Sequence, residues 1–270
     1  GEAVEQDVVG DPWIAYYLGT LYYDKKRYDE AIALWERSVA INPDFSIPWR
    51  NLGVAAYNVE GDPEKALARY EKAFSVNPGD GRVLSELDQL RRRTGVSPEA
   101  RLEALEARMD LVRARDDLST EIATLYNQTG QPQRALDYML SRRFHPWEGG
   151  TGRISRQYVR AHFLLGRAAL KADDPQTALT HFEAAQSTYP ENLGERKHLR
   201  WPDADVHYYT GLARQALGDE MGAEAAFRRV LDAPGGEVSE TATYRALALR
   251  ALGRDDEAEA RLCAMIEEAT

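Results

Sequence analysis

Small and hydrophobic residues recur along this chain at steps of three and four positions, between short polar stretches that contain glycine or proline. The residues of the first segment that follow this spacing are Ala15, Leu18, Gly19, Tyr22, Tyr28, Ala31, Trp35 and Val39. Positions three and four apart share one face of an α-helix, so the segment is predicted to form two amphipathic helices. Proline cannot donate the next backbone hydrogen bond, so Pro43 ends the second helix.

One alanine of the second helix has a counterpart in each later segment of the chain. The seven positions are Ala31, Ala66, Ala100, Ala135, Ala178, Ala223 and Ala258, separated by 35, 34, 35, 43, 45 and 35 residues. A period near 34 residues is typical of repeated helix–turn–helix units. A single hairpin cannot bury its apolar face alone, so these hairpins are predicted to stack on one another.

The pattern therefore predicts an all-α solenoid of about seven antiparallel helix hairpins, forming one domain over residues 1–270. The predicted repeats are 12–45, 46–80, 81–114, 116–142, 157–190, 203–234 and 239–270. Two insertions, 143–156 and 191–202, flank the fifth hairpin and are expected on the same edge of the solenoid. In the third repeat Asp88 replaces the small glycine of the first helix, and the second helix is expected to run long.

The repeats resemble the tetratricopeptide repeat family. The matching residues are Leu18-Gly19, Tyr22, Ala31, Trp35 and Pro43, and then Trp49, Leu52-Gly53, Ala66, Tyr70, Ala73 and Pro78. The resemblance implies a right-handed superhelix whose first helices line a concave groove, and this groove commonly holds a segment of a partner. Inward positions expected in the groove are Trp13, Tyr16, Tyr23, Arg50, Tyr57, Asn58, Arg92, Asn127, Arg160, Phe163, Arg167 and Tyr208. Aromatic and arginine residues dominate binding hot spots, although the same residues could pack within the chain.

The insertions carry a second resemblance. Phe144 to Gly150 and Asn192-Leu193-Gly194-Glu195, together with Gln157-Tyr158, Ala204-Asp205 and Tyr208-Tyr209, are similar to the C-terminal repeat region of a group of bacterial proteins. Those proteins carry an N-terminal β-rich domain of unknown function that looks related to carbohydrates. The resemblance implies a role beside sugar metabolism.

Three interpretations of the insertions stay open. Their aromatic residues fill gaps between irregular repeats, or they form a surface that binds a partner or a sugar, or Glu148 and Glu195 form an acid–base pair. The candidate ligand-binding or partner-binding residues are Phe144, His145, Trp147, Glu148, Arg153, Asn192, Glu195, Lys197, Trp201 and Tyr208. No catalytic residue is expected, because no serine or cysteine nucleophile stands in a recognisable setting.

All five histidines fall between residues 145 and 207, but their spacing matches no compact set of metal ligands. We therefore expect no metal and no cofactor, and His162 and His207 are expected on packing faces between helices. The single cysteine, Cys263, excludes an intramolecular disulfide and is expected to be a packed core thiol.

Composition limits the classes of partner. The net charge is −10, whereas a nucleic-acid binder normally shows a basic excess. Residues 142–200 carry 10 basic and 6 acidic side chains, which either are scattered solvated charge or attract an anionic ligand or an acidic partner. No apolar run is long enough for a membrane span and no signal peptide is visible, so a cytoplasmic location is expected. Gly1 in place of Met suggests an excised fragment.

The predicted function is that of a noncatalytic interaction scaffold. It would bind a protein or peptide segment, its own parent protein's N-terminal domain or a second subunit, through the concave groove and the loops 144–153 and 191–201. The alternative is an accessory part of a carbohydrate-processing enzyme, in which the loops complete a sugar site.

Overall fold

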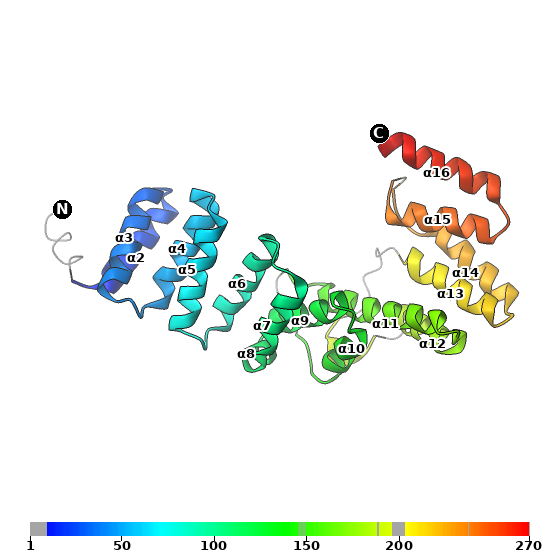
Figure 1. Ribbon diagram of the computed structural model, residues 1–270, viewed down its shortest axis with the longest axis horizontal. Coiled ribbons are helices and arrows are strands. Elements are labelled where there is room, and N and C mark those ends of the chain that lie inside the picture. Colours follow the sequence, from blue (N-terminus) through cyan, green and yellow to red (C-terminus); the bar gives the residue numbers. More distant parts are fainter. Residues whose placement is uncertain are drawn as a thin grey trace. The chain divides into compact units, whose positions relative to one another are not determined.

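The computed structural model describes residues 10–145, 147, 149–187, 189–195, 203–236 and 238–269. Every regular element in these residues is a helix, so the prediction of an all-α fold is confirmed (Figure 1). The chain forms two compact units, Gly1–Ser119 and Thr120–Thr270, called here the N-terminal and C-terminal units. Within the described residues, no helix is both long and apolar enough to cross a membrane.

The helices of the N-terminal unit follow one another as pairs. They are α2 (Pro12–Asp24), α3 (Tyr28–Ile41), α4 (Ser46–Ala55), the π-helical turn η1 (Ala56–Glu60), α5 (Pro63–Val76), α6 (Gly81–Arg93), α7 (Pro98–Glu106) and α8 (Met109–Ala114). Helix α9 (Asp116–Gln128) begins in this unit and continues into the next.

The C-terminal unit continues the pattern. Its further elements are α10 (Pro132–Leu140), α11 (Arg153–Lys171), α12 (Pro175–Ser187), the short 3₁₀ turn η2 (Glu191–Leu193), α13 (Ala204–Ala216), α14 (Glu220–Asp232), α15 (Glu240–Ala251) and α16 (Asp255–Ala269). Counted over the part of the chain that the structure describes, the helices form the seven predicted hairpins. They are numbered one to seven along the chain and are also called repeats below.

The two helices of a hairpin approach closely at a glycine. An added Cβ at Gly53 would lie 2.6 Å from the ring of Tyr70, and one at Gly211 would lie 2.4 Å from the ring of Phe227. The same contact joins Gly19 to Trp35 and Gly166 to Phe182. The repeated glycine therefore makes room for an aromatic ring of the second helix, which four of the hairpins bury in this way.

Several helices begin with a side-chain cap. The Asp62 side chain accepts a hydrogen bond from the backbone N–H of Lys65 at 2.9 Å, and Pro63 is the first residue of α5. The Ser97 side chain accepts one from the N–H of Ala100 at the start of α7. Such caps satisfy N–H groups that have no partner inside the helix.

The third repeat departs from the predicted pattern. Its second helix does not run long but breaks at Ala107 and Arg108 into α7 and α8. Asp88, at the glycine position of the first helix, is buried and receives hydrogen bonds from the Arg101 guanidinium at 3.0 and 2.6 Å. A buried ion pair thus occupies the place where other repeats pack glycine against an aromatic ring.

Two further expectations need correction. Helix α11 begins at Arg153, so the first insertion is shorter than the predicted 143–156. Cys263 lies on α16 and is exposed rather than packed in a core.

Candidate functional site

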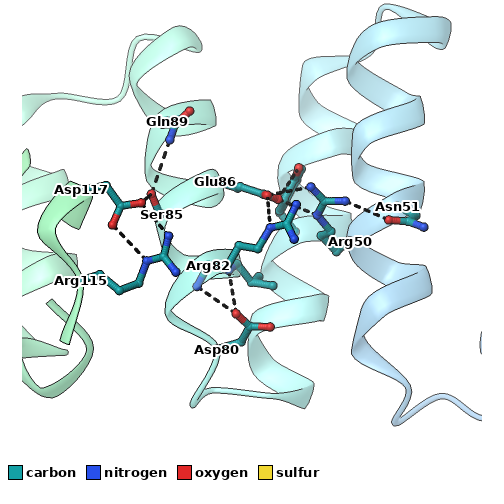
Figure 2. Close-up of polar contacts among 11 residues, drawn as sticks. Arg50, Asn51, Asp80, Arg82, Ser85, Glu86, Gln89, Arg115 and Asp117 are labelled. Carbon is teal, nitrogen blue, oxygen red and sulfur yellow. Dashed lines mark hydrogen bonds and ion pairs between the residues drawn. The ribbon is translucent and has the colours of Figure 1, made fainter. Parts of the chain in front are cut away.

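The first helices of the N-terminal unit share a ladder of charged and polar side chains (Figure 2). Arg50 of α4 donates from Nε and Nη2 to the two carboxylate oxygens of Glu86 on α6, at 2.6 and 2.7 Å. Arg82 also donates to Glu86, at 3.0 Å, and the Tyr70 hydroxyl of α5 donates to it at 3.2 Å. Glu86 therefore connects the second and third repeats.

The ladder continues from α6 to the start of α9. The Ser85 hydroxyl donates to Oδ2 of Asp117 at 3.0 Å, and Arg115 binds the same carboxylate through Nε and Nη2 at 3.0 and 2.8 Å (Figure 2). Asp80 caps α6 by accepting hydrogen bonds from the N–H groups of Arg82 and Val83.

Both central carboxylates stay charged at neutral pH. Burial acts to raise the pKa of Glu86, but the bonds from Arg50 and Arg82 outweigh it and hold that pKa below its ordinary value. For Asp117 burial again acts to raise the pKa, and the bonds from Arg115 and the Leu118 N–H lower it further than burial raises it. The ladder is therefore a set of charge-assisted contacts.

A hollow of about 110 Å³ lies beside this ladder. Its lining residues come from α4, η1, α5 and α6 and are Val54, Tyr57, Asn58, Tyr70, Glu86, Gln89, Leu90 and Arg93. The π-turn η1 carries Tyr57 and Asn58, and π-turns inside helices occur frequently at functional sites. The Arg93 guanidinium lies over the Tyr57 ring, 5.8 Å from its centre.

Exposed aromatic residues lie at the other end of the unit, on α2. Trp13 is 48% exposed and Tyr17 is 62% exposed, and the Trp13 ring lies 4.2 Å from that of Phe45. The sequence prediction included Trp13, Tyr57 and Asn58 in a groove but missed Glu86, Gln89 and Asp117. Opposite charges one repeat apart on successive first helices, such as Arg50 and Glu86, are the signal that could have identified the ladder.

The two insertions of the C-terminal unit, which are predicted on the same edge of the solenoid, contact each other. The backbone N–H of Phe144 donates to the carbonyl of Asn192 at 2.7 Å. The Asn192 side-chain amide donates in return to the carbonyls of Met139 and Arg142, at 2.8 and 2.7 Å. Asn192 thus ties η2 to the end of α10, and we call the contacts among residues 139–155 and 190–195 the clasp.

Glu195 completes the clasp at the start of α11. One carboxylate oxygen accepts a hydrogen bond from the Gly152 N–H at 2.7 Å. The other accepts bonds from the Ser155 N–H and hydroxyl, at 3.1 and 2.9 Å. Glu195 therefore caps a helix that lies about forty residues before it in the chain, where a negative charge is also favoured by the helix dipole.

The clasp gives Phe144 and Glu195 structural contacts within the chain. Phe144 is 1% exposed and lies beneath the Arg142 guanidinium, so its ring fills a gap between repeats and offers no stacking face; its expected place on a binding surface is corrected. Both oxygens of Glu195 bind the start of α11, which leaves the acid–base interpretation without support from the described residues. Its partner Glu148 lies outside them.

The other candidate residues are spread around the clasp. His145 and Arg153 are exposed, Arg153 lies 3.5 Å from Glu121, and Trp147 is half-buried against Gly150. Tyr208 lies on α13 and packs against Phe227 and Tyr244. Lys197 and Trp201, like Glu148, lie outside the described residues.

Within the described residues no group of three or more His, Cys, Asp or Glu side chains could hold a metal ion. His162 of α11 lies instead against His181 of α12, with their Nδ1 atoms 3.0 Å apart. Burial, and then the neighbouring His181, lowers the pKa of His162 from 6.5 to about 4, and burial also lowers the pKa of His181. Two charged imidazoles at this distance would repel each other.

We expect this pair to make stability depend on pH. The unfolded imidazole binds a proton at higher pH than the folded one, so stability is complete above about pH 6.5 and is lost as the pH falls towards 4. Urea unfolding at pH 7 and at pH 4.5 measures this change. Between the two pH values the free energy of unfolding of the wild-type chain should fall by about 2 kcal/mol more than that of the His162→Phe variant. Equal losses in the two proteins would contradict the prediction.

Comparison with known families identifies the repeats. Residues 19–60 match the family described as TPR repeat, and residues 120–192 match the one described as tetratricopeptide repeat. The chain thus contains tetratricopeptide repeats in both of its compact units. Such repeats generally mediate protein–protein interactions, and their fold is typically a noncatalytic scaffold.

Two curated relatives match a short part of the chain. The peroxisomal targeting signal receptor of Saccharomyces cerevisiae is 32% identical over 68 residues, which are 25% of this chain and 11% of that protein. The receptor of the same name from Kluyveromyces lactis is 29% identical over 68 residues, or 12% of its length. The chain therefore spans only about a tenth of these relatives.

Solved structures support the fold over most of the chain. A tetratricopeptide repeat protein from Parabacteroides merdae has a TM-score of 0.51 at 14% identity, covering 99% of this chain and 93% of its own. A chain of the Naa15/Naa10 complex bound to HypK-THB has a TM-score of 0.54 at 18% identity, covering 92% of this chain and 36% of its own. At these identities the likeness concerns the fold alone.

Proposed function

We propose that this chain is a noncatalytic interaction module that binds an extended segment of a partner protein on the first-helix face of the N-terminal unit. The binding face is defined here by Tyr16, Arg50, Tyr57, Asn58 and Arg93. The observation that carries the proposal is the hollow between α4, η1 and α6, where Tyr57 and Arg93 are accessible beside the fixed ladder.

Three properties of this face support peptide binding. Tyrosine and arginine are the residue types that dominate binding hot spots. The ladder holds Arg50 and Glu86 in bidentate contact before any partner arrives, so less side-chain freedom is lost on binding. Asn58 and Gln89 are exposed and can exchange hydrogen bonds with a partner's backbone.

The names of the two curated relatives agree with this class of function. The two yeast relatives are named as receptors for a targeting signal, and the match to them covers 68 residues. The proposed partner is therefore a short protein segment. It belongs to another protein, to the N-terminal domain of this chain's own parent protein or to a second subunit. The described residues of the clasp give no comparable support to a sugar site, since Phe144 is buried and Glu195 is engaged in capping.

The test is a peptide-display selection against the full chain, followed by calorimetry on the selected peptides. We expect Tyr57→Ala and Arg93→Gln each to weaken binding at least about tenfold, which corresponds to about 1.4 kcal/mol. The matched control is Arg37→Gln, which removes an exposed charge from the second helix α3 of the same unit. Unchanged affinity in both test variants, or a selection without any specific peptide, would reject this face as the site.

A further inference from the structure

A second cavity lies in the C-terminal unit. It has a volume of about 290 Å³ and is lined by residues of α12, α13 and α14 of the fifth and sixth repeats. Helix α13 contributes His207, Thr210 and Arg214, which are spaced three and four residues apart and therefore share one face. The volume is close to the lower end of the range found for small-molecule sites.

The same place in the second repeat is filled. Counted from Gly53 and Gly211, His207 occupies the position of Trp49. Counted from Tyr70 and Phe227, the aromatic residues of the second helices, Ala226 of α14 occupies the position of Arg69 on α5. In the second repeat the Arg69 guanidinium covers the Trp49 ring at 5.0 Å. In the sixth repeat the His207 imidazole replaces the Trp49 indole, and the Ala226 methyl group replaces the Arg69 guanidinium. These smaller groups leave the space between the helices unfilled.

The replacements also change the chemistry of the walls. Val39 and Leu52, which are buried in the core of the first two repeats, correspond to Gln186 and Thr210. The Gln186 amide donates to the Thr210 hydroxyl at 2.8 Å, so these polar groups are ordered. A packing defect would leave a cavity with apolar walls, whereas hydrogen-bonding side chains line this cavity.

Arg214 gives the cavity its preference for charge. Its Nε–H is buried and has no hydrogen-bond acceptor within the described residues. Its Nη atoms lie 3.4 Å from Glu183 and 3.7 Å from Asp219, which are long contacts, and its side chain is 32% exposed. An added Cβ at Gly222 would lie 2.6 Å from Nη1, so that glycine leaves room for the guanidinium.

Arg229 of α14 also lines the cavity. Glu183 in the lining and Asp219 just outside it offset the charges of Arg214 and Arg229, while the two arginines supply the cavity with several N–H donors. Guanidinium groups match carboxylate and phosphate oxygens in geometry and in charge. We infer that this cavity is a binding site for a small organic or inorganic anion, recognised by its carboxylate or phosphate group through Arg214 and Arg229.

The experiment is calorimetry of the full chain with succinate, citrate and inorganic phosphate as probes, and with putrescine and mannitol as a cationic and a neutral comparison. We expect one or more of the three anions to bind at a single site with a dissociation constant below about 1 mM. Putrescine and mannitol are expected not to bind. Binding of the carboxylates alone or of phosphate alone tells which group the site prefers.

Two variants assign the binding to the cavity. Arg214→Gln should weaken it at least about tenfold, the loss of about one charge-assisted hydrogen bond. His207→Trp restores the residue of the second repeat and should abolish binding by filling the space. The control is Arg228→Gln, which removes a charge on the same helix α14 from a residue paired with Glu224 outside the lining.

The inference is overturned if none of the three anions binds, or if Arg214→Gln and Arg228→Gln bind equally well. If His207→Trp does not fold, Arg214→Gln alone decides. Peptide binding in the N-terminal unit is expected to be the same in wild type and in Arg214→Gln, so the outcome is independent of the proposed function.

Discussion

Replacing Asp88 with alanine is expected to lower the free energy of unfolding of the N-terminal unit by about 3–5 kcal/mol. The Asp88 and Arg101 side chains are each 3% exposed and are joined by two hydrogen bonds. Removal of the carboxylate takes away the acceptor of two hydrogen bonds from a buried guanidinium, which is far more costly than the loss of an exposed pair. Urea unfolding followed by circular dichroism measures the change.

Two further variants separate this effect from a general loss of stability. The double variant Asp88→Leu with Arg101→Met replaces the pair by apolar groups and should recover most of the lost stability. Asp110→Ala breaks the exposed contact to Arg108 in the same unit and should leave the free energy of unfolding nearly unchanged. If Asp88→Ala costs as little as Asp110→Ala, the buried pair does not have the role given to it here.

Replacing Phe144 with alanine is expected to cost about 3–5 kcal/mol in the C-terminal unit. The ring is 1% exposed, and the backbone of this residue is bonded to Asn192, so the surrounding chain cannot easily collapse into the space. The expected observable is a lower midpoint of urea unfolding for this unit.

Leu140→Ala is the matched control for that measurement. Leu140 lies at the end of α10, close to the clasp in sequence, and is 50% exposed. Its truncation should cost less than about 1 kcal/mol. A Phe144→Ala variant as stable as Leu140→Ala would show that the clasp does not depend on this ring.

The helical hairpins could be predicted from sequence because their cause is local. Ala31 and Gly53 have counterparts in other repeats, such as Ala66 and Gly211, and the ring that each glycine contacts belongs to its own hairpin. With short-range periodicity of this kind, the spacing of residues in the sequence indicates which of them lie on the same helix face and contact each other. The same reasoning predicts both insertions on one edge of the solenoid, because they lie one repeat apart in the sequence.

The roles of single polar residues could not be predicted in this way. Asn192 and Glu195 were singled out as ligand contacts, yet they bond to Met139 and Gly152, about fifty and forty residues earlier. A carboxylate that caps a distant helix has the same sequence signature as one that binds a ligand. Asp88 was likewise recognised as an unusual residue, but its partner Arg101 became clear only once the two helices were placed.

The position of Glu195 has a consequence for engineering. Shortening the connection after α12 to the usual repeat length would delete the acceptor at the start of α11, so its first turn should fray although no residue of that helix had changed. The fifth repeat is therefore not an interchangeable module. Exchange or deletion of repeats is expected to succeed only when residues 139–195 are moved together as one cassette.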